Sequence, residues 1–92
     1  MKELIYRAAL RKWGPEKQVA KLAEEAAELS AVAARSLTSC CDEAVLAEEM
    51  ADVEIMIEQF RQNGMDKLID FQKTKKLARL AERLGVINND VL

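Results

Sequence analysis

The chain contains no histidine. This absence excludes Ser-His-Asp and Cys-His nucleophile systems, the HExxH zinc site and every histidine metal ligand. The only cysteines, Cys40 and Cys41, are adjacent, which suits neither a CxxC redox pair nor a zinc knuckle, and vicinal cysteines rarely bridge each other. We therefore expect inert thiols in a reducing compartment, and any metal chemistry has to use oxygen ligands.

Long apolar runs and a strong net charge are also missing. No apolar stretch approaches the ~20 residues that cross a bilayer, and the start at residues 1–3 does not resemble a signal peptide. We therefore expect a cytoplasmic protein without a membrane partner. A formal net charge of −2, with no dominant basic block, argues against nucleic acid as a partner.

The composition that remains favours closely packed helices. Half of the 92 residues are hydrophobic but only 4% are aromatic, and alanine, leucine, glutamate and lysine are abundant. A chain of this length forms a single domain, residues 1–92, and many helical proteins this small recruit a second copy to complete their core. We predict an all-α antiparallel bundle of about four helices, completed as a homodimer or a dimer of dimers.

Apolar spacing and turn residues locate the first two helices. The first helix is predicted over 2–12 and is broken by the Trp-Gly-Pro sequence at 13–15. The second runs from Pro15, a residue suited to a first helical position, to about Ser36. Its predicted inward stripe has near-heptad spacing and consists of Val19, Leu22, Ala26, Leu29, Ala33 and Leu37.

A polar turn separates these helices from two more. Ser39 or Asp42 is the predicted N-cap of the third helix, which ends at the Asn-Gly pair at 63–64. The fourth helix spans about 66–84 and stops at Gly85.

Two acidic motifs lie inside apolar runs, Glu-Glu-Ala-Ala-Glu at 24–28 and Glu-Glu-Met-Ala-Asp at 48–52. Carboxylates three residues apart lie on nearly one face of a helix, so each motif offers two oxygen ligands toward a common point. Two such helices packed together form a cage of four carboxylates, which repels itself unless hard divalent cations such as Mg²⁺ neutralise it.

The angular positions of the acids support burial. Glu49 lies about 40° from Val53, inside the apolar stripe of its helix, and Asp52 lies about 60° further round at the margin. Glu25 lies about 40° beyond Leu29, at the edge of the other stripe. We predict that Glu49 is not solvated and that it needs a cation or a basic side chain.

A simpler interpretation stays open. Glutamates are common on solvated helix faces, and Lys21 with Glu25 forms an ordinary i,i+4 pair. In that case the chain is a non-catalytic helical interaction module whose acids solvate its bundle.

The two motifs, with their apolar neighbours over 21–29 and 46–53, resemble the short, single-domain phage and bacterial members of the MazG-like all-α nucleoside triphosphate pyrophosphohydrolases. The resemblance implies Mg²⁺-dependent hydrolysis, with Mn²⁺ able to substitute, of the bond between the α- and β-phosphates of a (deoxy)nucleoside triphosphate. The related phosphoribosyl-ATP pyrophosphohydrolases share the motifs and remain an alternative. The metal ligands implied by the resemblance are Glu25, Glu28, Glu49 and Asp52.

The resemblance also implies phosphate contacts from the fourth helix, at Lys76 and Arg79. Thr74 departs from the family, whose members often have asparagine just before this lysine, and this leaves the local register open. The alternative is a basic solvated face near a helix C-terminus, which the helix dipole favours.

The remaining site predictions concern the base and the attacking water. Glu24, left off the metal, is the candidate general base. Trp13 is placed to stack on a nucleobase, and Gln18 and Lys21 to contact base edge, sugar or phosphate, although a lone tryptophan is also typical of a core or a dimer interface.

Overall fold

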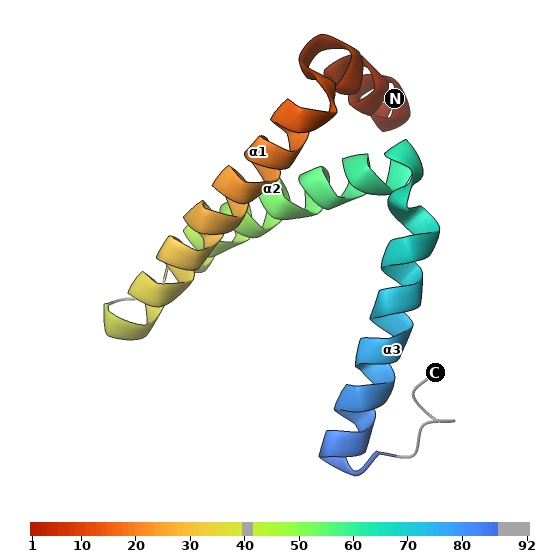
Figure 1. Cartoon of the computed structure of the whole chain (residues 1–92). Helices are drawn as coiled ribbons and strands as arrows, with labels where there is room; N and C mark the ends of the chain where they lie inside the picture. Colours follow the sequence, from red (N-terminus) through yellow and green to blue (C-terminus); the bar gives the residue numbers. More distant parts are fainter. Residues whose placement is uncertain (40–41, 87–92) are drawn as a thin grey trace.

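The computed structural model describes residues 1–39 and 42–86, and these form helices and short connections without a strand. The elements in chain order are α1 (Lys2–Thr38), α2 (Glu43–Phe60), a short π-helical turn η1 (Arg61–Met65) and α3 (Asp66–Leu84), drawn in Figure 1. The all-α prediction is confirmed for this part of the chain. Cys40 and Cys41, predicted to be inert thiols, lie outside the described residues.

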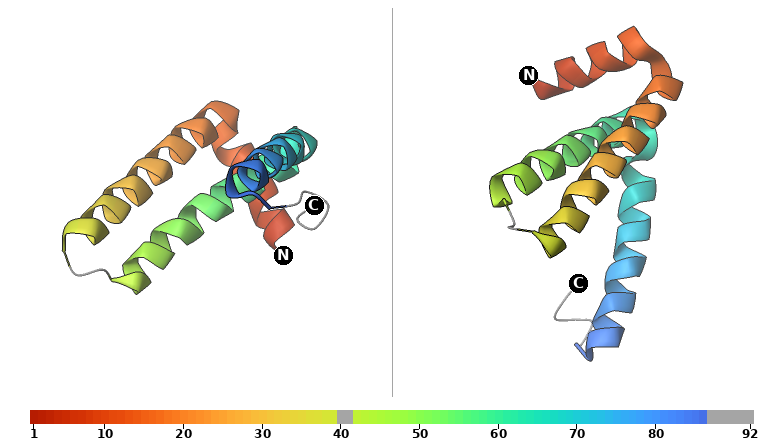
Figure 2. Two further views of the ribbon diagram at one scale, coloured as in Figure 1. Left: turned by 90° about the horizontal axis from the view of Figure 1, so that it is seen from below. Right: turned by 90° about the vertical axis from the view of Figure 1, so that its left-hand side faces the viewer.

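A break at Gly14 divides α1 into two segments that point in different directions (Figures 1 and 2). Gly14 has φ 82° and ψ 165°, a conformation that is accessible to glycine and costly for any residue with a Cβ atom. Pro15 then begins the longer segment, where its missing N–H and fixed φ carry no penalty. The predicted break between the first two helical segments is therefore confirmed.

The longer segment of α1 and α2 form an antiparallel hairpin (Figure 1). Asp42 begins α2, because its carboxylate accepts hydrogen bonds from the backbone N–H groups of Ala44 and Val45, at 3.0 and 3.4 Å. Ser39 instead follows the end of α1, where its hydroxyl donates to the carbonyl oxygen of Arg35 at 2.9 Å. Of the two predicted N-caps, Asp42 is confirmed and Ser39 is wrong.

The hairpin buries polar as well as apolar side chains along its seam. Helix α1 contributes Gln18, Glu25 and Val32, and α2 contributes Met56 and Gln59. The α1 residues recur every seven positions, or about two helical turns, so they share one line along the helix. This line passes through the acidic motif and sets Glu25 in the interior.

The predicted inward stripe of the second helix differs from this seam. Val19 and Leu37 are exposed, whereas Leu22 and Leu29 are half-buried. The buried line therefore runs one residue earlier than an apolar count predicts, because Gln18 and Glu25 occupy positions that hydropathy assigns to solvent. Apolar side chains of α1 are left on the outer surface as a result.

The short N-terminal segment of α1 is held against the end of α2. The Tyr6 hydroxyl donates a short hydrogen bond to the Glu58 carboxylate, and the Lys2 ammonium lies 3.3 Å from the same group. Gln62 donates to the carbonyl oxygen of Glu3 at 3.0 Å. These contacts fix the segment that ends at Trp13 beside the hairpin.

Helix α3 extends away from the hairpin and packs mainly on η1 next to it (Figures 1 and 2). Gly64 makes this corner with φ 110°, and α3 ends as predicted at Gly85. The radius of gyration is 16.3 Å, against about 12 Å for a compact domain of 92 residues. The described part of the chain thus forms a two-helix hairpin with α3 beside it, and the predicted bundle of about four helices stays a prediction.

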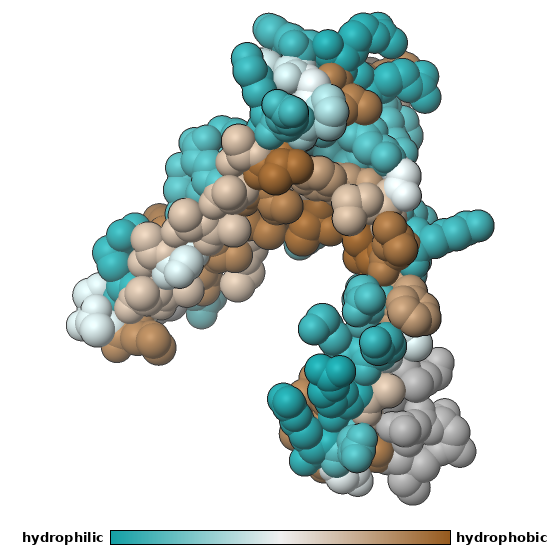
Figure 3. Space-filling model, viewed as in Figure 1, coloured by the Kyte–Doolittle hydropathy of each residue, from teal (hydrophilic) through white to brown (hydrophobic). Residues whose placement is uncertain are grey.

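The open shape leaves apolar surface uncovered. The accessible surface is 7266 Å², whereas a compact monomer of 10.3 kDa exposes about 5,350 Å². Apolar residues gather over the hairpin and at the corner between α2 and α3 (Figure 3). Among the described residues, no helix is both long and apolar enough to cross a membrane.

Candidate metal centre and adjoining pocket

Four carboxylates from the two acidic motifs converge in the hairpin. Glu25 and Glu28 project from α1, and Glu49 and Asp52 from α2. One oxygen from each lies within 4.8 Å of an oxygen from every other. The helical spacing of three residues therefore brings each pair to one face, and the antiparallel packing brings the two pairs together.

Burial distinguishes the four groups. Glu25 is only 6% exposed and Glu49 is half-buried, while Glu28 and Asp52 are exposed. One buried oxygen each of Glu25 and Glu49 has no hydrogen-bond partner within the part of the chain that the structure describes. The prediction singled out Glu49 as the buried acid, but the more deeply buried one is Glu25, because the seam of α1 runs through it.

The electrostatic environment of Glu49 is unfavourable to its charge. Burial is the largest cause that raises the pKa of its carboxyl above the ordinary value, followed by the negative charges of Glu28, Asp52 and Glu25 and a hydrogen bond with Glu28. The cluster thus combines desolvation with like-charge repulsion, the condition that a bound cation relieves.

Lys21 is the basic group that touches the cluster. Its ammonium lies 3.2 Å from an oxygen of Glu25 and 3.5 Å from an oxygen of Glu24. The hydrogen bond with Glu25 is the main cause that raises the pKa of Lys21. The simpler interpretation predicted this i,i+4 pair. The pair engages one oxygen of Glu25, and the other oxygen has no hydrogen-bond partner within residues 1–39 and 42–86.

The residues fit a hard divalent cation. Mg²⁺–oxygen distances of about 2.1 Å place opposite ligands of an octahedron about 4.2 Å apart. The four carboxylate oxygens all lie within 4.8 Å of one another, so small side-chain adjustments toward a common centre are needed to meet that geometry. Carboxylates without nitrogen or sulfur ligands suit Mg²⁺, Mn²⁺ or Ca²⁺ rather than softer metals.

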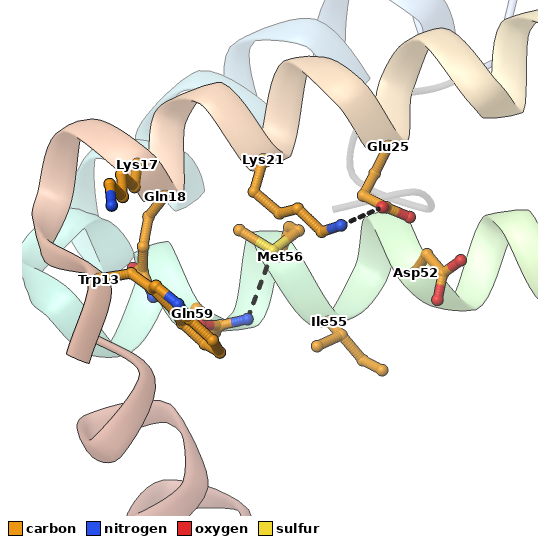
Figure 4. Close-up of a pocket in the computed structure, with 9 residues that line it drawn as sticks. All are labelled: Trp13, Lys17, Gln18, Lys21, Glu25, Asp52, Ile55, Met56 and Gln59. Carbon is orange, nitrogen blue, oxygen red and sulfur yellow. Dashed lines mark hydrogen bonds and ion pairs between the residues drawn. The ribbon is translucent and has the colours of Figure 1, made fainter. Parts of the chain in front are cut away.

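A pocket of about 730 Å³ continues from the cluster along the hairpin (Figure 4). Glu25 and Asp52 line one end, and Lys21 crosses the middle. The other end is lined by Trp13 and Gln18. This volume is within the usual range for small-molecule sites. All three predicted nucleotide-binding residues, Trp13, Gln18 and Lys21, thus line one cavity that opens onto the carboxylates.

Trp13 is not a core residue of this chain. It is 52% exposed, and the Lys12 ammonium lies over its ring at 5.4 Å from the centroid. An indole half open to solvent at the rim of a pocket offers a flat surface on which a base can stack.

Gln59 also lines the pocket, and the sequence analysis missed it. It lies seven residues after Asp52, as Gln18 lies seven residues before Glu25, so each glutamine shares a helix face with a carboxylate of the cluster. This spacing is the sequence signal that identifies it.

Three predicted site residues are not part of the cluster. Glu24 is exposed on α1, and its carboxylate is not among the four that converge. Lys76 and Arg79 are on α3, where Lys76 lines a separate groove with Ile57 and Leu80. Within one chain, α3 does not bring these cations to the carboxylates.

Comparisons with known proteins add no identification: no family model, curated protein or solved structure matches the chain. The resemblance to the MazG-like pyrophosphohydrolases therefore rests on the two acidic motifs and their apolar neighbours, and it stays a prediction.

Proposed function

We propose that the chain is a divalent-cation-dependent nucleoside triphosphate pyrophosphohydrolase that releases pyrophosphate and a nucleoside monophosphate. The observation that supports this most strongly is the carboxylate cluster, with its unpartnered buried oxygens, at one end of a nucleotide-sized pocket. A solvated acidic face does not account for Glu25, because this glutamate is only 6% exposed.

The pocket has a polarity that matches a nucleotide. Along α1, Glu25 and Gln18 are separated by about 10 Å, because seven residues rise 1.5 Å each. The cation and the phosphates belong at the acidic end, and the base belongs at the Trp13 end. Lys21 lies between them, where the triphosphate passes.

The chemistry follows from these residues. When bound at Glu25, Glu28, Glu49 and Asp52, Mg²⁺ supplies charge neutralisation of the phosphates and an acidified water. Lys21 exchanges its contact with Glu25 for a phosphate oxygen. Glu24, 3.5 Å from Lys21, is our candidate to accept the proton of the attacking water. The oxygen of that water bonds to the α-phosphorus, and the bond from this phosphorus to the bridging oxygen breaks as pyrophosphate leaves.

A second copy of the chain is part of the proposal. The excess accessible surface is roughly 1,900 Å² per chain, so a pair that covers it buries an area typical of obligate dimers. Because α3 lies apart from its own hairpin, Lys76 and Arg79 from a neighbouring copy are the candidates to contact the triphosphate.

Pyrophosphate release from a panel of nucleoside triphosphates tests the proposal. We expect turnover with Mg²⁺ and none with a chelator, and loss of turnover in Glu49→Gln and Asp52→Asn at unchanged helical content. Glu54→Gln is the matched control, since Glu54 is an exposed acid of the same helix outside the cluster. Pyrophosphate release by Glu49→Gln at the wild-type rate would refute the site. Phosphoribosyl-ATP is included in the panel to distinguish the related phosphoribosyl-ATP pyrophosphohydrolase activity.

A further inference from the structure

Three side-chain amides form a directed chain of hydrogen bonds at the Trp13 end of the pocket. Asn63 Nδ2 donates to Gln18 Oε1 at 3.2 Å, and Gln18 Nε2 donates to Gln59 Oε1 at 2.8 Å. Gln18 is 3% exposed and Gln59 is 7% exposed. Gln18 and Gln59 each accept with the oxygen and donate with the nitrogen, so the first donor, Asn63, sets the direction of the chain of amides.

The chain of amides ends in a nitrogen with a poor partner. Among the residues that the structure describes, Gln59 Nε2 donates only to the thioether sulfur of Met56, at 3.4 Å. Thioether sulfur is a weak acceptor, and an amide nitrogen carries two protons. A nearly buried N–H group without a good acceptor lowers the stability of the fold unless a ligand accepts a hydrogen bond from it. Figure 4 shows Gln59 beside Trp13 and Gln18, with its nitrogen directed along the pocket toward Met56.

The surroundings of this nitrogen suit a planar, partly polar ligand. The half-exposed Trp13 indole lies at the same end of the pocket, and Met56 and Ile55 supply apolar contacts. A base that stacks on the indole turns its edge toward the amides.

We infer that Gln59 Nε2 donates a hydrogen bond to a carbonyl oxygen on the edge of the bound nucleobase, so that the site selects oxo-bases over adenine, which has no carbonyl. This inference deepens the proposed function and rests on it in one respect, because it takes the ligand to be a nucleotide. Gln59 is the specificity-determining residue, and Asn63 is a positioning residue that fixes the direction of the amide.

The cleanest probes are inosine 5′-monophosphate and adenosine 5′-monophosphate, which differ in having an oxygen or an amino group at position 6. The single tryptophan reports base stacking by fluorescence quenching, and neither a divalent cation nor hydrolysis is needed. We expect the inosine nucleotide to bind at least about tenfold more tightly, because a buried donor left facing an amino group is penalised.

Two substitutions test the residues separately. In Gln59→Met, which keeps the length of the side chain and removes the amide, the preference falls to near unity, whereas Gln72→Met on α3 leaves it unchanged. In Asn63→Asp, the carboxylate can only accept, so Gln18 turns to donate to it and Gln59 turns to donate to Gln18. The carbonyl of Gln59 then faces the base, and the preference inverts toward the adenosine nucleotide.

Equal binding of the two nucleotides by the wild-type chain, or no quenching by either, overturns the inference. A preference for the inosine nucleotide that persists in Gln59→Met also overturns the inference. If Gln59→Met does not fold, Asn63→Asp is the test, and an unchanged preference in that variant overturns the inference. The proposed function fails separately: binding with the expected preference but no pyrophosphate release refutes the hydrolase alone. Hydrolysis without base preference refutes the inference alone.

Discussion

Removing the charge of Glu25 is the perturbation whose result follows most directly from the geometry of the cluster. A cation that binds only the folded chain stabilises it by mass action. At about ten times the half-saturating Mg²⁺ concentration the gain is about 1.4 kcal/mol. For a domain of this size that gain raises Tm by roughly 6–11 °C. The rise is expected only if the converging carboxylates hold the ion.

Glu25→Gln keeps the shape of the side chain but removes the negative charge of one of the four converging carboxylates, the proposed ligands. If that ligand contributes about 1.4 kcal/mol, the affinity falls about tenfold. At the same Mg²⁺ concentration the gain then drops to about 0.4 kcal/mol, or roughly 2–3 °C in Tm.

Thermal unfolding followed by far-ultraviolet circular dichroism measures both values, with ionic strength matched by NaCl so that general screening cancels. Glu54→Gln is the control, because it removes one negative charge from α2 outside the cluster. An equal Mg²⁺-dependent rise in Glu25→Gln and Glu54→Gln would show that the buried glutamate is not a ligand. No rise in the wild type would favour the non-catalytic interaction module.

Three further predictions concern titration and backbone geometry. The hydrogen bond with Glu58 raises the pKa of Tyr6 to about 12 from 10.0, so absorbance titration of this single tyrosine should have its midpoint near 12 and return toward 10 in Glu58→Gln. The folded state holds that proton more tightly, so its contribution to stability is complete below pH 10 and is lost as pH rises toward 12; a midpoint near 10 in the wild type contradicts the contact. Burial and its acidic neighbours raise the pKa of Glu49 from 4.5, so the metal-free folded state binds more protons than the unfolded chain. Tm without metal should therefore fall as pH rises from below 4.5 through the raised pKa, and a Glu49→Gln profile of the same slope would disprove this. Gly14→Ala should cost about 1–3 kcal/mol through backbone strain alone, since nothing lies within 4 Å of the added Cβ, and an unchanged Tm in thermal melts would exclude the φ of 82°.

The local features of the fold were predictable because they depend on single residues. Gly14 and Pro15 determine the break in α1, and Gly85 determines the end of α3. The convergence of the two acidic motifs was predictable for a similar reason. Helical periodicity puts residues three apart on one face, and a short turn makes consecutive helices antiparallel neighbours.

The remaining features depend on contacts between segments distant in sequence. Hydropathy assigns Gln18 and Gln59 to solvent, yet a hydrogen bond joins them in the seam, a pairing visible only once α1 and α2 are in register. The inward stripe through Val19 was wrong for the same reason. The positions of Lys76 and Arg79 relative to the carboxylates depend on the corner at Gly64 that directs α3 away from the hairpin, which helical periodicity does not determine.

Hydrolysis in water enriched in heavy oxygen tests the central claim most directly. Wild-type protein with Mg²⁺ and a nucleoside triphosphate should put the label into the nucleoside monophosphate and none into pyrophosphate, because the proposed reaction is attack of water on the α-phosphorus. Label in pyrophosphate or inorganic phosphate, or equal labelling of the monophosphate by Glu49→Gln, would contradict the account.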